Sequence, residues 1–272
     1  MTQQDLTSTS PRYRIKPSPL VGIVMVVLYI VVTFSIQLGT GIPYKDWIST
    51  PENGLRAAVI PLIVGSLLLI VFLVIARWDM IWRDPGRLPV TTVMKVAMVF
   101  FIACIVLRVF GIDWGSVDPA LLFVVIASGV LVGFAEEMLF RGIFLRSLRT
   151  NGRTEAVAAL WTAIAFGLFH LPNLIVGVGG GQIIQVVLAA ASGATLYAFR
   201  RYRGLILTGM IAHGTWDMST FLAGSNGRDW LNFAGLLVAI VSLILGIAVL
   251  VSVWRKDKRT VVTPAGIGER QK

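Results

Sequence analysis

Long apolar segments separated by short polar ones run through most of this chain. Crossing a hydrocarbon core of about 30 Å takes roughly 20 apolar residues in a helix, and eight segments have about that length. Helices are predicted because backbone groups inside a bilayer must find their hydrogen-bond partners within the protein, and the alternation of a barrel strand is absent. The pattern therefore predicts an all-α, polytopic membrane bundle of about eight transmembrane helices. They are expected at Leu20–Leu38, Ala57–Ala76, Val90–Val109, Pro119–Leu148, Glu155–Leu171, Gln182–Phe199, Gly204–Leu222 and Trp230–Trp254.

The polar segments alternate in charge along the chain. Both tails and every even-numbered loop carry several Lys or Arg residues, whereas the odd-numbered loops are neutral, mixed or acidic. Because basic loops stay on the cytoplasmic side, we expect a multi-pass cell-membrane protein with both termini in the cytoplasm. The polar segments 1–18 and 256–272 are expected to be disordered cytoplasmic tails. A single transmembrane domain remains, over residues 19–255.

Composition agrees with a membrane protein and excludes several other classes. The chain is 56% hydrophobic and 14% charged, against roughly 25% charged residues in soluble domains. The net charge of +10 lies in loops and forms no basic stripe with aromatic residues, so lipid rather than nucleic acid is the expected partner. One cysteine, Cys104, excludes an intrachain disulfide framework and a Cys-rich zinc site. Lys95 and Arg108, near the ends of the third segment, are expected to reach the interface without a functional role.

Two adjacent carboxylates, Glu136 and Glu137, lie inside the fourth apolar segment. Ionisable groups at membrane depth cost about 2.5–3.5 kcal/mol each on insertion scales, so a functional role is the first hypothesis. Arg141 follows Glu137 by four residues, and this spacing allows a structural ion pair on one helix face. Glu136 points about 100° away and is left free for chemistry. A structural network that uses both carboxylates is the alternative.

The two histidines of the chain, His170 and His213, also lie in apolar segments. Asp217 follows His213 by four residues and is positioned to orient its ring. At about 1.5 Å per residue from the basic loops, Glu136 and His213 lie about 15–20 Å deep. His170 comes out at about 25 Å by the same count, so the fifth helix must tilt or begin in water if the three are to meet.

Three motifs follow one another on separate segments: E-E-x-x-x-R at 136–141, F-x-x-x-H at 166–170 and H-x-x-x-D at 213–217. Together they resemble the CAAX protease and bacteriocin-processing family of intramembrane proteases. This family is also called the Abi family, and its eukaryotic branch is the type II CAAX prenyl endopeptidase. The resemblance extends over about residues 130–220 and implies a protease core within residues 119–222.

The resemblance implies that the protein hydrolyses a peptide bond of a membrane-associated peptide or lipidated protein. Carried over by position, Glu136 would activate water, His170 would help to hold it, and His213 with residue 217 would support the oxyanion. The family pattern usually has Asn at this last position. An ionised Asp217 cannot donate a hydrogen bond, so orienting His213 is its more natural role. Water must reach such a site, and we expect a cavity open to the cytoplasm between the fourth, fifth and seventh helices.

The metal requirement stays open at this stage. Glu136, His170 and His213 around an open position would be a zinc-hydrolase ligand set, and family members are commonly labelled metalloproteases. The H-E-x-x-H spacing of zincins is absent, so no tightly bound metal is favoured and Zn²⁺ is the alternative. Two other functions remain as alternatives. One is a non-catalytic immunity or scaffold member of the same fold, and the other is a proton-coupled transporter that uses the same buried ionisable residues.

Overall fold

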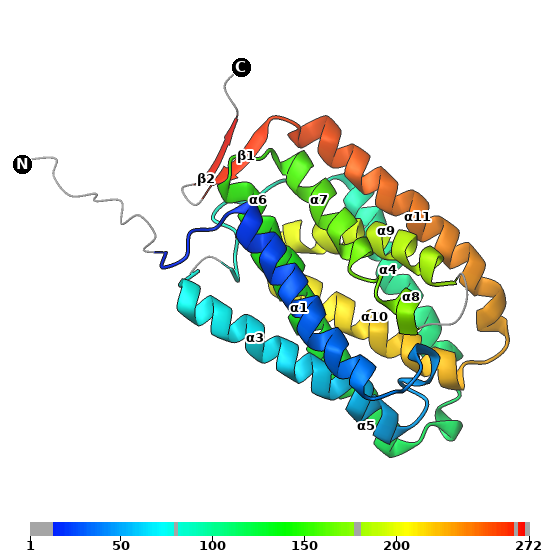
Figure 1. Cartoon of the computed structure of the whole chain (residues 1–272). Coiled ribbons are helices and arrows are strands. Elements are labelled where there is room, and N and C mark those ends of the chain that lie inside the picture. Colours follow the sequence, from blue (N-terminus) through cyan, green and yellow to red (C-terminus); the bar gives the residue numbers. More distant parts are fainter. Residues whose placement is uncertain (1–12, 79–80, 177–180, 264–265, 270–272) are drawn as a thin grey trace, which may run out of the picture.

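The computed structural model describes residues 13–78, 81–176, 181–263 and 266–269, and it shows a helical bundle with a small hairpin at one end (Figure 1). Each long helix begins close to where the hydropathy pattern predicts. The α-helices are α1 (Pro19–Gly39), α2 (Pro51–Gly54), α3 (Ile60–Ala76), α4 (Thr92–Gly111), α5 (Pro119–Glu137), α6 (Leu145–Thr150), α7 (Glu155–Leu168), α8 (Asn173–Val176), α9 (Gly181–Arg201), α10 (Ile206–Asn226) and α11 (Trp230–Asp257). The shorter or wider helical segments are η1 (Tyr44–Asp46), η2 (Leu55–Val59), η3 (Trp114–Ser116), η4 (Met138–Phe144) and η5 (Tyr202–Gly204), and the strands are β1 (Thr260–Thr263) and β2 (Gly266–Glu269).

The expectation of a helical membrane bundle is confirmed. In the described part of the chain, seven helical segments are long and apolar enough to cross a membrane. The eighth expected span corresponds to α10, which has 21 residues but is less apolar because it carries His213, Asp217 and several hydroxyl side chains. It packs along α5 inside the bundle, where His213 is buried and Asp217 faces a cavity.

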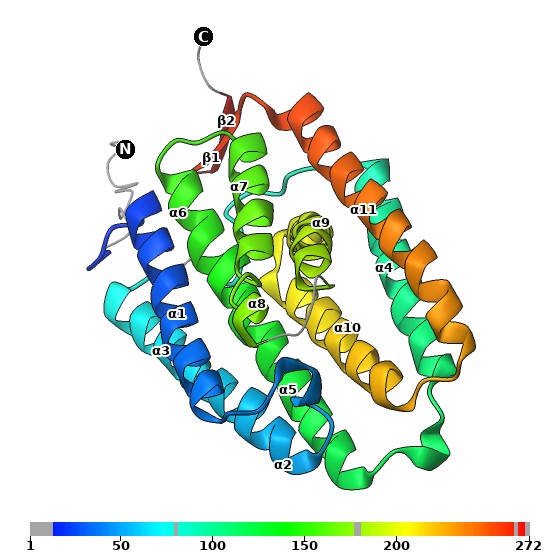
Figure 2. The same ribbon diagram turned by 45° about the vertical axis from the view of Figure 1, so that its right-hand side comes forward.

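The helices form a bundle with an inner group and two outer pairs (Figure 2). Helices α1 and α3 lie side by side on one face, and α4 and α11 lie together on the opposite face. Helices α5, α7, α9 and α10 fill the space between them. The start of α1 and the strand β2 lie at the same end of the bundle (Figure 1), as an even number of crossings requires.

The fourth span is one continuous run, Pro119–Thr150. The Asp118 carboxylate accepts a hydrogen bond from the Ala120 backbone N–H (2.7 Å), and Pro119 occupies the first helical turn, where its missing N–H costs nothing. Directly after Glu137 the helix widens into the π-helical segment η4, Met138–Phe144. Such wide turns are rare and occur often at functional sites.

Basic residues at the end of the bundle that carries the termini are partly buried and paired. The Arg149 guanidinium contacts Glu155 at 2.6 Å and Asp84 at 3.0 Å. Arg201 contacts Asp257 at 2.6 Å, and both side chains are nearly inaccessible. These arginines therefore tie loops and helix ends together in addition to marking this end by their charge.

The tails differ from the expectation of disorder wherever they are described. The backbone N–H groups of Arg14 and Ile15 donate to the Ala76 carbonyl at 3.1 and 3.4 Å. In the C-terminal tail, β1 and β2 form an antiparallel hairpin, and Val261 forms a β-bridge with Thr154. Backbone hydrogen bonds hold these short segments, and a search for long apolar runs does not detect that kind of order. The remaining tail residues, 1–12, 264–265 and 270–272, lie outside the described part.

Candidate active site

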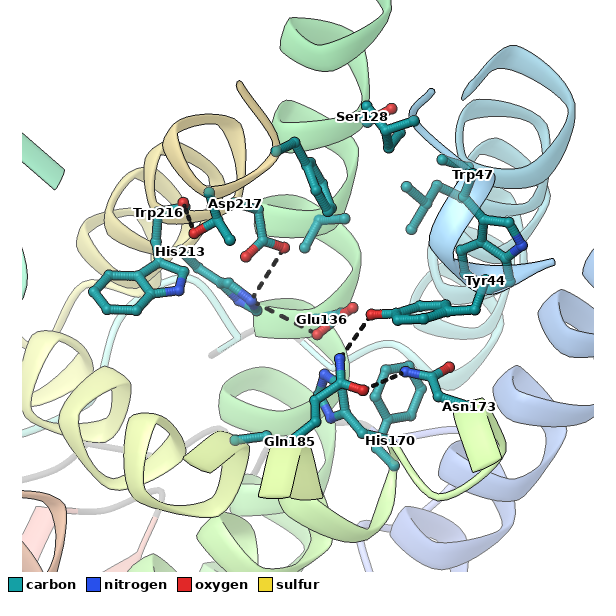
Figure 3. A pocket seen from close by; sticks show the side chains of 18 of the residues that line it. Tyr44, Trp47, Ser128, Glu136, His170, Asn173, Gln185, His213, Trp216 and Asp217 are labelled. Atoms are coloured by element: carbon teal, nitrogen blue, oxygen red, sulfur yellow. Dashed lines mark hydrogen bonds and ion pairs between the residues drawn. The ribbon is translucent and has the colours of Figure 1, made fainter. Parts of the chain in front are cut away.

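A cavity of about 740 Å³ lies within the bundle, between α1, α5, α9, α10 and the loop after α1. The candidate catalytic residues Glu136, His170, His213 and Asp217 all line it (Figure 3). Glu136 comes from the end of α5, His170 from the turn after α7, and the other two from α10. Side chains that are far apart in the sequence therefore face one shared cavity.

Glycines let α5 and α10 approach closely enough to form this site. A Cβ atom on Gly214 would lie 2.5 Å from the Gly129 carbonyl oxygen, and a Cβ on Gly133 would lie 3.1 Å from the Gly214 nitrogen. Small residues at such crossings allow helix backbones to pack in direct contact. This contact brings Glu136 beside His213.

His213 sits between three carboxylates. Its Nδ1 lies 3.0 Å from Glu137 Oε1, and its Nε2 lies 3.7 Å from Glu136 Oε2 and 3.9 Å from Asp217 Oδ2. An ionised carboxylate only accepts hydrogen bonds, so Nδ1 carries a hydrogen and donates it to Glu137. Nε2 is the ring nitrogen that is left for chemistry.

Glu137 and Arg141 form the ion pair that their spacing predicts. Arg141 Nη1 donates to Glu137 Oε1 at 2.6 Å, and both side chains are fully buried. Arg141 Nη2 donates to the Gly193 carbonyl at 2.8 Å. The arginine is thus held by two helices, and Glu137 is held by Arg141 and His213.

Glu136 is bound far less tightly than its neighbour. The residue is 8% exposed, and its Oε2 atom is buried without a hydrogen-bond partner among the described residues. An unpaired carboxylate oxygen in such a place is costly unless water or a ligand pairs with it. Glu137 Oε2 also lacks a partner among the described residues, but Glu137 does not line the cavity. Of the two carboxylates, Glu136 is therefore the one that can bind a water molecule there.

His170 reaches the cavity although a simple depth count puts it deeper than Glu136. The ion pair of Arg149 with Glu155 holds the end of α6 and the start of α7 at the same depth in the bundle. Counted from this pair, Glu136 and His170 lie at similar numbers of residues along their helices. His170 Nδ1 lies 2.9 Å from the Phe166 carbonyl oxygen. That oxygen only accepts, so Nδ1 carries the hydrogen, and the neutral ring presents Nε2 as an acceptor.

Further polar residues on the cavity wall escaped the sequence analysis. Gln185 Nε2 donates to the Tyr44 hydroxyl oxygen at 2.7 Å, and Asn173 Nδ2 donates to Gln185 Oε1 at 3.1 Å. Tyr44 lies in a loop with no motif, whereas Gln185 is a polar residue within an apolar span and could have been noticed. Arg108 also lines the cavity, with its guanidinium 3.9 Å above the Trp216 ring, and is more than an interface residue.

The phenol of Tyr44 stays protonated in this setting. Burial raises the pKa of Tyr44 above its usual value, and the nearby carboxylates of Asp217 and Glu136 raise it further, against a lowering by the hydrogen bond from Gln185. A protonated phenol is both a donor and an acceptor. Tyr44 therefore brings a neutral hydrogen-bond donor to the cavity.

The cavity extends towards the end of the bundle opposite the basic loops. Its lining at this end includes Lys45 of η1, Ser49, Asn173 of α8 and Ser225 near the end of α10. Among the described residues, none from the basic loops takes part in the lining. We expected the cavity to open towards the basic loops, and the described residues do not show such an opening. The ion pairs of Arg149 and Arg201 lie between the cavity and these loops.

The zinc alternative would place a metal ion between Glu136, His170 and His213. Within the described ranges, no group of three or more His, Cys, Asp or Glu side chains is arranged to bind a metal ion. Glu136, His170 and His213 share the cavity, and the bond from His213 Nδ1 to Glu137 leaves Nε2 of this ring available to a ligand. The metal requirement therefore stays a prediction.

A family model described as type II CAAX prenyl endopeptidase Rce1-like matches residues 118–219. This match confirms the resemblance to the CAAX protease family over a segment that contains Glu136, His170, His213 and Asp217. The segment covers less than half of the chain and does not include Tyr44. Searches of curated proteins and of solved structures gave no match.

Proposed function

We propose that this protein is an intramembrane endopeptidase that cleaves a membrane-associated peptide or lipidated protein with water activated by Glu136. The family match supports a protease of this class. The observation that carries the proposal is the buried Glu136 carboxylate, which has an oxygen without a partner among the described residues and faces a cavity shared with both histidines.

The geometry supports a general-base mechanism. Glu136 takes a proton from water while the water oxygen attacks the scissile carbonyl carbon. His170 Nε2 accepts the other water hydrogen and so fixes the orientation of the attacking oxygen. Glu136 then passes its proton to the leaving amine as the C–N bond breaks.

His213 serves the same reaction from the other side of Glu136. With a hydrogen on each ring nitrogen it donates Nδ1–H to Glu137 and presents Nε2–H to the developing oxyanion. Stabilising that charge in a site with little water lowers the barrier strongly. Asp217, 3.9 Å from Nε2, helps to orient the ring.

We propose the orientation with both termini in the cytoplasm, on the strength of the loop charges. In that orientation the cavity faces the non-cytoplasmic side, and a substrate reaches it from there or laterally from the bilayer. The transporter alternative needs a path to both ends of the bundle, and the described residues line the cavity from one end only. A cleavage assay distinguishes the peptidase from the non-catalytic immunity or scaffold alternative.

The test compares wild-type protein with Glu136→Gln and His170→Ala. Membrane peptides from cells that express each form identify candidate substrates, and purified protein in lipid nanodiscs then gives the cleavage rate. Loss of a general base lowers the rate by about 10²–10⁴-fold, and we expect both variants to fall by at least 10² with unchanged thermal unfolding. Two folded variants that cleave at the wild-type rate would refute the protease assignment.

A further inference from the structure

The loop after α1 brings an aromatic hydroxyl to the reacting centre. Tyr44 begins the short helix η1, and its ring packs edge-on against Trp47 with centroids 4.8 Å apart. Trp47 is fixed in turn because its indole N–H donates to the Ile42 carbonyl at 3.1 Å. In Figure 3 the Tyr44 hydroxyl points towards the Glu136 carboxylate, across the space that the two share.

The hydrogen bonds around Tyr44 run in one direction. Asn173 donates to Gln185, and Gln185 donates to the Tyr44 oxygen. Among the described residues Gln185 is the one hydrogen-bond partner of this hydroxyl, and Tyr44 is the acceptor in that bond. The phenolic hydrogen is therefore free to donate into the cavity, and the preceding donors polarise it for that purpose.

The site needs a neutral donor in this region. His213 is one candidate donor for the oxyanion, but Asp217 beside it presents carboxylate oxygens, which accept hydrogen bonds when ionised. A carboxylate close to a developing negative charge repels it. A neutral donor that reaches the same carbonyl oxygen from across the cavity would supply the stabilisation that an ionised Asp217 cannot give.

We propose that Tyr44 is a catalytic residue that donates a hydrogen bond to the carbonyl oxygen of the scissile peptide bond, in place of a donor at position 217. This inference rests on the proposed peptidase function. When the water oxygen adds to the carbonyl carbon, the π electrons move onto the carbonyl oxygen, and Tyr44 O–H stabilises the charge without giving up its proton. The proton from water goes to Glu136 and then to the leaving amine, so Tyr44 ends the cycle unchanged.

The first experiment measures kcat and KM of Tyr44→Phe in nanodiscs with a peptide that the wild-type protein cleaves. Removing one oxyanion donor typically costs 10²–10³-fold in kcat, and we expect a loss in this range with KM changed less than threefold. Tyr202→Phe, which changes an exposed tyrosine at the opposite end of the bundle, is the matched control and should leave both constants unchanged. A Tyr44→Phe kcat within threefold of wild type would overturn the proposal while Glu136→Gln still reports on the peptidase function.

A second variant tests whether Tyr44 acts as a hydrogen-bond donor to the substrate or whether its hydrogen bond with Gln185 only holds the loop against α9. In Gln185→Glu the ionised side chain accepts from Tyr44, so the tie is kept but the phenolic hydrogen is drawn away from the cavity. We expect this variant to lose kcat as Tyr44→Phe does. Full activity in a folded Gln185→Glu protein would show that the direction of the hydrogen bond is irrelevant and would contradict the proposal.

A third variant tests whether Tyr44 replaces a hydrogen-bond donor at position 217. Asp217→Asn introduces an amide donor, so in the Tyr44→Phe background it should raise kcat at least tenfold, whereas in the wild-type background it should change kcat much less. Strict additivity of the two substitutions would mean that Tyr44 and position 217 do not share one task, and the proposal would fail.

Discussion

The contact between α5 and α10 makes the position of Glu136 sensitive to one methyl group. In Gly133→Ala the new Cβ would lie 2.3 Å from the Met210 carbonyl oxygen, about 1 Å inside ordinary contact distance. Neither atom belongs to a flexible side chain, so the helices must separate by about that amount. Overpacking of this kind costs typically 1–3 kcal/mol of stability, and a 1 Å misplacement of reacting groups can cost 10²-fold in rate.

The assay is cleavage in nanodiscs, with thermal unfolding measured on the same preparation. We expect Gly133→Ala to unfold at lower temperature and to lose about 10²-fold in kcat, because the 3.7 Å separation of Glu136 and His213 increases. The control is Gly235→Ala on α11, where an added Cβ meets nothing within 4 Å. A fully active Gly133→Ala protein would show that the α5–α10 distance does not govern catalysis.

Three further outcomes follow from the described geometry. Arg141→Met should lower the free energy of unfolding by about 3–5 kcal/mol because Glu137 is left charged and buried, and adding Glu137→Gln should recover most of that loss in thermal unfolding; no recovery would mean that the pair is not coupled. With Cys104 replaced by Ala, Ser225→Cys places a single thiol at the rim of the cavity. This thiol should react with a membrane-impermeant reagent that is added outside intact cells. If the thiol reacts only after the cells are lysed, the proposed orientation is reversed. Because burial raises the pKa of Tyr44, the native state holds its phenolic proton above about pH 10 while the unfolded chain releases it. Stability should therefore fall there as pH rises, and less so in Tyr44→Phe, as followed by alkaline unfolding; identical curves would place Tyr44 in solvent.

The long helices could be predicted from the sequence because the thickness of the bilayer sets the length of each apolar segment. The Glu137–Arg141 pair was accessible for a similar reason, since helix periodicity puts residues four apart on one face. Grouping Glu136 with two histidines from other spans depended on motif order rather than on periodicity.

The rest depended on contacts between segments far apart in the chain. The depth of His170 could not be counted correctly because the ion pair of Arg149 with Glu155 sets the level of α7. Tyr44 has no local signal, since its role comes from Gln185 on α9. The side on which the cavity lies depends on which loops close over the site, and loop charge alone does not determine this.

The π-helical segment η4 has a consequence for how this protein tolerates length changes. A turn of this kind contains one residue more than an α-helical turn needs, so an in-frame loss of a single codon between Met138 and Phe144 would let the backbone revert to regular helix. Because the wide turn absorbs the extra residue, this deletion would leave Glu136 close to its present orientation relative to α6. A single-residue loss in the regular helix α6 has no such reserve, and it would rotate Glu136 by about 100° relative to the residues that follow the deletion.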